Sequence, residues 1–123
     1  MLSKNQMVAH RKAIERLYDS SCTVIVSQEY VSDNGVTEFK DVILYSKQPC
    51  RISQQSVTKA SNNHVVSEVD KAISLYIAPE LDIPAGSKIL ITYNNLTREY
   101  KSAGLPAVYD TYQKIQLEYV GWV

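Results

Sequence analysis

The feature that most constrains the fold is a change of hydrophobic period near residue 20. Before it, apolar residues recur at the 3.6-residue spacing of a helix; after it, apolar and polar residues alternate with a period of two through most of the chain. A helix is predicted over residues 5–18, which contain no Gly, Pro or Thr. Asp19-Ser20-Ser21 then breaks the helical pattern. One helix followed by a long alternating region predicts a mainly β protein.

The alternating region divides into short predicted strands separated by turns. Asp33-Asn34-Gly35 and Asn94-Asn95 have the composition of hairpin turns, because these residues tolerate positive φ. Six to seven short strands after one helix predict a small antiparallel β-barrel, since closure removes the exposed strand edges. We expect one domain over residues 1–123, with the barrel over 22–120. The strands are predicted at 22–30, 36–46, 48–53, 71–77, 88–93, 96–102 and 114–119.

Residues 54–70 are the weakest stretch of the strand pattern. They are rich in Gln, Ser and Asn, and we expect a long polar loop there, with a short strand near Val65-Val66. Loops of this length are uncommon in compact domains, and those that occur are usually functional or disordered.

The predicted helix carries two distinct faces. Its apolar face holds Met7, His10, Ile14, Leu17 and Tyr18. Its basic face has two interpretations: a solvated surface, or a docking helix that meets an acidic or polar partner. The residues of the basic face are Lys4, Arg11, Lys12 and Arg16.

The charge balance argues against dedicated nucleic-acid binding. Thirteen basic and thirteen acidic side chains cancel, whereas nucleic-acid binders usually carry a basic excess. A local patch and a weak contact with DNA remain compatible with this balance.

No local motif supports catalysis or metal binding. His10 and His64 are the only histidines, and neither lies in a catalytic signature. Cys22 and Cys50 are too far apart in sequence for the close pairs of zinc sites, so buried core cysteines are the better interpretation. We expect a protein that is not an enzyme and that holds no cofactor or metal.

The sequence also lacks the patterns of a secretory signal and of a membrane-spanning segment. The polar N-terminus lacks the apolar stretch of a secretory signal, and no run approaches the ~20 apolar residues that span a bilayer. We therefore expect a reducing cytosolic setting and no membrane association.

Six of the nine tyrosines divide between predicted core and predicted interface positions. Tyr18, Tyr93 and Tyr119 fall on faces predicted to be buried. Tyr combines a large apolar body with a polar tip, which suits a wet protein interface. The interface candidates are Tyr76, Tyr109 and Tyr112, with Trp122 near the C-terminus.

Five segments together resemble the small head–tail connector (head-closure, or "minor capsid") proteins of phages and prophages of Gram-positive bacteria. The resemblance covers most of residues 49–123. Its segments are Pro49-Cys50-Arg51-Ile52-Ser53, Ile83-Pro84-Ala85-Gly86-Ser87-Lys88-Ile89, Ser102-Ala103-Gly104-Leu105-Pro106-Ala107-Val108-Tyr109, Gln113-Lys114-Ile115-Gln116-Leu117 and Gly121-Trp122-Val123.

The resemblance implies a virion protein at the neck, assembled in the cytoplasm of the bacterial host. Such proteins form a ring, here expected to be hexameric, between the portal or adaptor and the tail-side proteins, where they close the DNA exit channel. It implies only weak contact with packaged double-stranded DNA and no small-molecule substrate. One barrel loop would project into the channel, and the candidate here is 54–70. Its candidate side chains are Gln54, Gln55, Lys59, Asn62, Asn63 and His64.

The alternative is a small β-barrel that binds single-stranded nucleic acid. Its tyrosines would act as stacking platforms for the bases. The balanced charge counts against this function, because phosphate binding normally requires a local excess of Lys and Arg.

Overall fold

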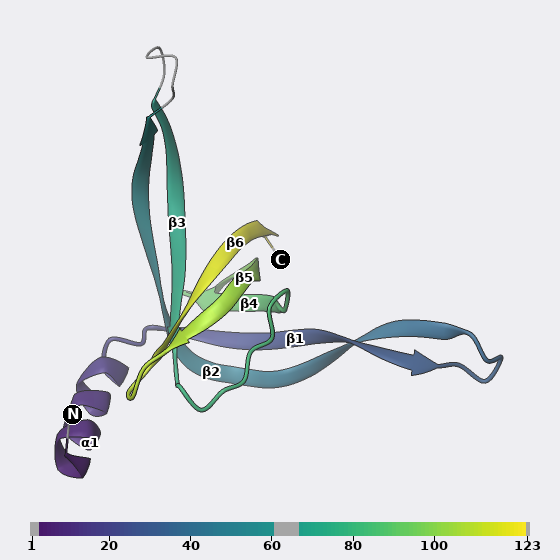
Figure 1. The fold of residues 1–123 in the computed structure, drawn as a ribbon, viewed down its shortest axis with the longest axis horizontal. Coiled ribbons are helices and arrows are strands. Elements are labelled where there is room, and N and C mark those ends of the chain that lie inside the picture. Colours follow the sequence, from purple (N-terminus) through teal and green to yellow (C-terminus); the bar gives the residue numbers. More distant parts are fainter. Residues whose placement is uncertain (1–2, 61–66, 123) are drawn as a thin grey trace.

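The computed structural model describes residues 3–60 and 67–122. One helix precedes six antiparallel strands, so the mainly β prediction is confirmed (Figure 1). The strands close on themselves in the order β1-β2-β3-β6-β5-β4. The elements are α1 (Lys4–Glu15), β1 (Ser20–Val31), β2 (Thr37–Ala60), β3 (Ser67–Ile77), β4 (Lys88–Tyr93), β5 (Leu96–Val108) and β6 (Gln113–Trp122).

Strand β2 joins two predicted strands into one. The predicted strands 36–46 and 48–53 are continuous across Lys47, whose φ is +51°. The β1–β2 register shifts there, from Cys22 opposite Gln48 to Val24 opposite Tyr45. A bulge of this kind bends a strand without ending it. The strand count therefore falls at the lower end of the predicted six to seven.

Two two-stranded ribbons leave the closed ring in different directions (Figure 1). Strand β1 pairs with β4 only over Ser21–Ile25, so beyond Ile25 it pairs with β2 alone. Strand β3 pairs with β6 only over Ile73–Ile77, so the part of β3 before Ile73 pairs with β2 alone. We call residues 26–42 the β1–β2 ribbon, and the paired parts of 54–72 the β2–β3 ribbon.

The predicted loop over 54–70 is wrong for most of its length. Residues 54–60 belong to β2 and residues 67–70 to β3, in a register that runs from Gln54 opposite Ile73 to Ala60 opposite Ser67. The physical reason is that two strands that pair only with each other, outside the ring, have no core face to fill, so a polar composition does not exclude strands. The proposed short strand at 65–66 lies outside the described residues.

The interior of the ring is filled by side chains of the strands themselves. The aliphatic residues at every second position of β3, β4 and β6 point into this interior. Tyr93 and Tyr119 were expected in the core, but both are about half exposed, because each lies toward the end of its strand. The core residues are Cys22, Val24, Cys50, Ile73, Leu75, Ile77, Ile83, Ile89, Ile91, Tyr100, Ile115 and Leu117.

A buried glutamine fixes the connection between β3 and β4. Gln113 is almost fully buried, and its Nε2 donates to the carbonyl oxygens of Ala78 at 2.7 Å and Leu81 at 2.6 Å. The backbone N–H of Asp82 also donates to the Tyr45 hydroxyl at 3.0 Å. Buried polar groups of this kind are stable only when they are paired, so these bonds hold the connection against the ring.

Helix α1 lies outside the ring. A capping box starts it: Ser3 Oγ accepts from the backbone N–H of Gln6, and Gln6 Oε1 accepts from the N–H of Ser3. It ends at Glu15, earlier than the predicted residue 18, and Tyr18 turns toward the ring half-buried. None of its residues is fully buried, so tertiary packing holds it only lightly.

Candidate functional site

The candidate sites lie on the outside of the ring, because core side chains fill its interior. Within residues 3–60 and 67–122, no group of three or more His, Cys, Asp or Glu side chains could hold a metal ion. The described residues instead present a tyrosine cluster, a cleft under helix α1, a hollowed end of the ring and the exposed β1–β2 ribbon.

Three of the predicted interface residues form one aromatic cluster. Tyr76 on β3 lies 5.8 Å from Tyr112 between ring centroids, and Tyr112 stacks on Tyr109 at 4.8 Å. The turn between β5 and β6 brings them together, since the N–H of Tyr109 donates to the carbonyl of Tyr112 at 2.8 Å. Contacts of this geometry add to the stabilisation from burial. Trp122 lies elsewhere, opposite Arg98 in the β5–β6 register.

A cleft of about 370 Å³ separates helix α1 from the ring. Its walls combine the inner face of the helix with two members of the tyrosine cluster. Burial raises the pKa of the Tyr18 hydroxyl to about 12, and among the described residues no hydrogen-bond partner is found for it. The cleft is therefore apolar and aromatic with a few polar atoms. Its lining is His10, Ile14, Leu17, Tyr18, Arg51, Ser53, Tyr76 and Tyr112.

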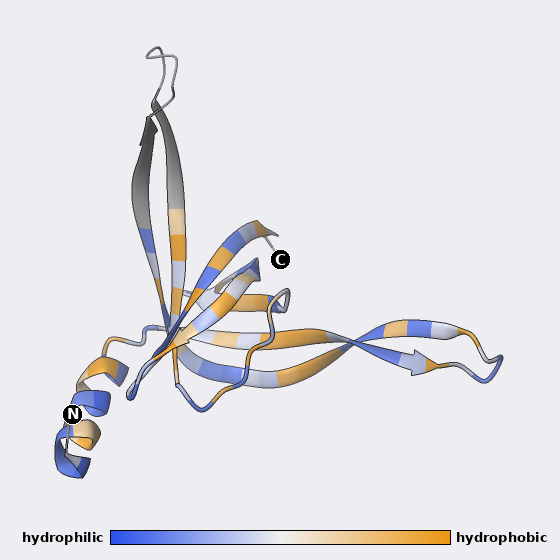
Figure 2. Cartoon of the chain, viewed as in Figure 1, coloured by the Kyte–Doolittle hydropathy of each residue, from blue (hydrophilic) through white to orange (hydrophobic). Residues whose placement is uncertain are grey.

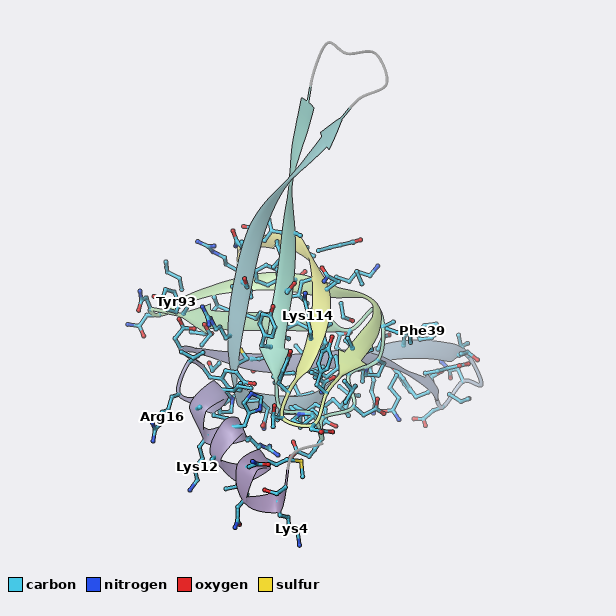
Figure 3. The ribbon with its side chains drawn as sticks, turned by 60° about the vertical axis from the view of Figure 1, so that its left-hand side comes forward. Lys4, Lys12, Arg16, Phe39, Tyr93 and Lys114 are labelled. Carbon is cyan, nitrogen blue, oxygen red and sulfur yellow. The ribbon has the colours of Figure 1, made fainter. Side chains whose placement is uncertain are left out.

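The four basic residues predicted for helix α1 divide into two groups. Arg11 faces the ring, where its guanidinium is ion-paired with Glu80 and its Nε donates to Glu15 at 2.8 Å. These hydrogen bonds hold the pKa of Arg11 above its ordinary value, and the bond to Arg11 lowers the pKa of Glu80. The others project away from the ring (Figure 3): Lys4, Lys12 and Arg16.

The two histidines have different positions. His10 lies on helix α1, where its Nδ1 is 3.1 Å from the Thr111 hydroxyl, a contact that helps to attach the helix. His64 lies outside the described residues, as do Asn62 and Asn63. The structure therefore does not relate His64, Asn62 or Asn63 to any other candidate group.

The two cysteines are core residues, as predicted. Cys22 and Cys50 are fully buried and free, on neighbouring strands. A hydrogen bond to Cys22, together with burial, raises the pKa of the Cys50 thiol well above its ordinary value. A protonated buried thiol is neither a nucleophile nor a good metal ligand.

One end of the ring is hollowed where the β2–β3 ribbon leaves it. Two adjoining depressions of about 320 and 510 Å³ share Gln54, Arg98 and Tyr100 in their walls. Gln54 therefore lies at the junction between ring and ribbon, with its side chain exposed. Gln55 and Lys59 follow it in β2, within the ribbon.

The β1–β2 ribbon contains hydrophobic residues among hydrophilic ones (Figure 2), and several of the large ones are exposed. Val31 is 69% exposed and Phe39 70%, on the same face because Glu29 pairs with Phe39 and Val31 with Thr37. Sequence reasoning missed this surface. The apolar alternation of a ribbon that extends into solvent is the same as that of a core strand, and only the length of the predicted hairpin could have suggested that its tip lies beyond the ring.

Comparison with known proteins gives one structural likeness. No protein-family model and no curated protein matches the chain. The structure is similar to that of the phage-like element PBSX protein xkdH from Bacillus subtilis, with a TM-score of 0.47 and 11% identity over 81% of this chain and 90% of that one. A likeness of this degree does not by itself assign a function. Among the described residues, no helix has the length and apolar character to cross a membrane.

Proposed function

We propose that the chain is a non-enzymatic structural component of a tailed-phage virion. In this proposal it forms a ring of identical copies at the head–tail interface, between portal or adaptor and tail-side proteins, and closes the DNA exit channel. The likeness of residues 49–123 to connector proteins motivates the virion assignment. The ribbons of the fold support a role in assembly.

The observation that carries the proposal is the pair of ribbons without partners. An isolated two-stranded ribbon is marginally stable in water, and the β1–β2 ribbon also exposes Val31 and Phe39. Exposed apolar surface of this kind marks protein–protein contacts. A closed ring of copies would cover such a surface on every subunit, because each subunit presents two different patches to its two neighbours.

The β2–β3 ribbon is the candidate for the segment that reaches into the channel. Over 54–72 its charges balance, since Lys59 and Lys71 match Glu68 and Asp70. A channel lining must release DNA, and affinity for phosphate rises steeply with each added cation. A neutral ribbon with Gln and Ser in its sequence fits a weak contact with double-stranded DNA. Two hydrogen-bonded strands also fix its direction better than a loop could.

Removal of the protein from the phage or prophage that encodes it tests the proposal. Heads that fill with DNA but neither retain it nor join tails are expected when the gene is deleted. Normal particles without the protein would refute the virion role.

A shortened β2–β3 ribbon tests the gate separately. In one variant a tight turn replaces residues 55–72, which keeps Gln54 opposite Ile73. We expect this variant to enter particles that then leak DNA. A matched variant with a shortened β1–β2 ribbon should fail to enter particles. Retention of DNA by the first variant would contradict the gate assignment while leaving the ring in place.

A further inference from the structure

The β1–β2 ribbon is acidic as well as apolar. Across residues 26–42, Lys40 stands against four acidic residues, which gives a net charge of −3. Glu29 lies directly opposite Phe39 in the register, so a carboxylate borders the exposed aromatic ring on one face. The acidic residues are Glu29, Asp33, Glu38 and Asp41.

Two of these carboxylates remain available for a partner on the Phe39 face and at the tip of the ribbon. Asp41 is 3.5 Å from Lys88, near the base of the ribbon, and is therefore already paired. Glu38 lies on the other face, opposite Tyr30, whose hydroxyl donates to it at 2.6 Å, and Lys40 lies on that same face. For Glu29 and Asp33, no ion pair is found in the part of the chain that the structure describes. Both are exposed.

Helix α1 presents the complementary surface. Lys4, Val8, Lys12 and Arg16 follow one another at intervals of four residues, which places them in one row along the helix. All four residues are exposed, and the exposed fraction of Val8 is 54%. Residues 4–16 carry a net charge of +3, since Glu15 offsets one of four basic residues. We call these four residues the basic row.

The two surfaces match in length and in pattern. The basic row is about 18 Å long at 1.5 Å per residue. The β1 strand of the ribbon, from Val26 to Val31, is about 17 Å long at 3.3 Å per residue. Each surface has exposed apolar side chains beside charged ones, and the signs of the charges are opposite. Complementary charges of this kind favour encounter and fix register more than they add affinity.

The two surfaces cannot meet within one molecule. Helix α1 and the tip of the β1–β2 ribbon lie at opposite ends of the structure (Figure 1), and Phe39 is remote from Lys12 and Arg16 (Figure 3). The whole chain is neutral, so the charge is separated rather than in excess. A neutral molecule with one acidic and one basic end is suited to head-to-tail contact with copies of itself.

We propose that the acidic face of the β1–β2 ribbon docks on the basic row of helix α1 in the next copy of the chain. This names the contact between neighbours, and it rests on the proposed ring. A row about 18 Å long and ~10 Å wide covers about 200 Å² per partner, far below the ~800 Å² of a stable interface. The contact is therefore weak for a free pair, and closure of a ring strengthens it, because the last contact becomes intramolecular.

A charge-swap experiment in solution tests the contact. One variant reverses the ribbon with Glu29→Lys and Asp33→Lys, and another reverses the helix with Lys12→Glu and Arg16→Glu. Self-association is measured by sedimentation at about 0.01 M and about 1 M ionic strength, between which screening becomes severe. A matched control reverses Lys101 and Glu118, two exposed residues that face each other on β5 and β6.

Wild-type protein and the control should associate at low salt, with a loss at high salt. Each swap alone should weaken association at least tenfold, because like charges then meet. A mixture of the two swaps should restore it, since each ribbon again meets a helix of opposite sign. Circular dichroism and thermal unfolding of every variant confirm that the fold persists.

Three results would overturn the contact. Wild-type protein that stays monomeric at about 1 mM and low salt would exclude docking on a second copy. If neither swap weakens association, the interface between copies lies on another part of the chain. Tighter binding of a short duplex DNA than of a second copy, abolished by the helix swap, would make the basic row a DNA contact. The virion role is tested by gene deletion, so it can survive each of these results.

Discussion

The guanidinium of Arg11 is ion-paired with the carboxylate of Glu80, with Nη2 and Oε2 2.9 Å apart. This pair ties helix α1 to the connection between β3 and β4, and the His10–Thr111 contact lies on the same side. Since no residue of helix α1 is fully buried, these polar contacts determine the position of the helix relative to the ring. The position of the basic row therefore depends on Glu80.

Replacement of Glu80 by Gln should loosen the helix without unfolding the ring. Both side chains are partly exposed, so we expect a loss of at most about 1 kcal/mol in unfolding free energy. Hydrogen exchange of the α1 amides should become several-fold faster. Glu15→Gln is the matched control, because it removes a partner of Arg11 that lies within the helix. Unchanged exchange in Glu80→Gln would show that other contacts hold the helix.

Attachment of the helix should also depend on pH. The hydrogen bond to Arg11 holds the pKa of Glu80 below its ordinary value of 4.5. A carboxyl with a lowered folded-state pKa stabilises the folded state fully above its unfolded pKa, and this stabilisation is lost as the pH falls through the folded value. Exchange of the α1 amides, corrected for the intrinsic effect of pH, should therefore rise in acid in the wild type. The Glu80→Gln variant should lack that step, and a step of equal size in both would assign it to another group.

Gln113→Leu should be strongly destabilising for a single substitution. It removes two hydrogen bonds and leaves the carbonyls of Ala78 and Leu81 without their donor. We expect a loss of about 2–3 kcal/mol in urea unfolding. Gln116→Leu is the control on the same strand, because that side chain is exposed and its bond to Ser74 is long at 3.4 Å. Equal losses in the two variants would contradict the anchoring role of Gln113.

The two cysteines should be chemically silent in the folded protein. Cys22 and Cys50 are fully buried, so a reagent in water reaches neither sulfur, and the raised pKa of Cys50 also keeps that thiol protonated at neutral pH. A thiol reagent such as Ellman's should label neither residue in water and both in concentrated urea. Rapid labelling of the native protein would mean that the ring opens between β1 and β2.

The bulge in β2 predicts opposite effects of glycine at two lysines. Lys47 has a φ of +51°, a conformation that is strained for residues other than Gly, whereas Lys101 has a negative φ in β5. Lys47→Gly should be neutral or stabilise by up to about 1 kcal/mol, and Lys101→Gly should destabilise by about 0.5–1 kcal/mol. Thermal unfolding of both variants measures the difference. A larger loss at Lys47 would show that its side chain matters more than its backbone.

Much of the ring could be predicted from the sequence, because buried faces leave a clear pattern. Leu75, Ile77, Ile89 and Ile115 belong to sets of aliphatic residues that recur at every second position of a strand, and all four are in the core. The turn at Asn94-Asn95 was predictable because both residues adopt positive φ.

The ribbons could not be predicted, because each lies outside the closed ring and pairs only within itself. In the β2–β3 ribbon, polar residues form strands without an apolar alternation, so 54–70 has the composition of a loop. In the β1–β2 ribbon, Phe39 and Val31 have the alternation of core residues but are exposed. The hydrophobic periodicity of a sequence reflects which residues are buried. It shows neither how exposed strands pair nor how far a hairpin extends beyond its domain.

The candidate surfaces were predictable only in part. Tyr76, Tyr109 and Tyr112 were singled out as interface residues, and the fold gathers them beside helix α1. Arg11 was grouped with the outward basic residues, yet it pairs with Glu80, 69 residues away. Arg11 pairs with Glu80 because the β3–β4 connection passes close to helix α1. The spacing of residues in the sequence does not show the path of that connection.

The location of the protein in purified phage particles tests the central claim most directly. Electron cryo-microscopy of particles, with quantitative mass spectrometry of their proteins, would show where the chain lies and in how many copies. The account predicts one symmetric ring at the neck, with a small fixed number of copies per particle and with β2–β3 ribbons directed at the channel. Absence of the chain from particles, or copies spread over the capsid shell, would contradict it.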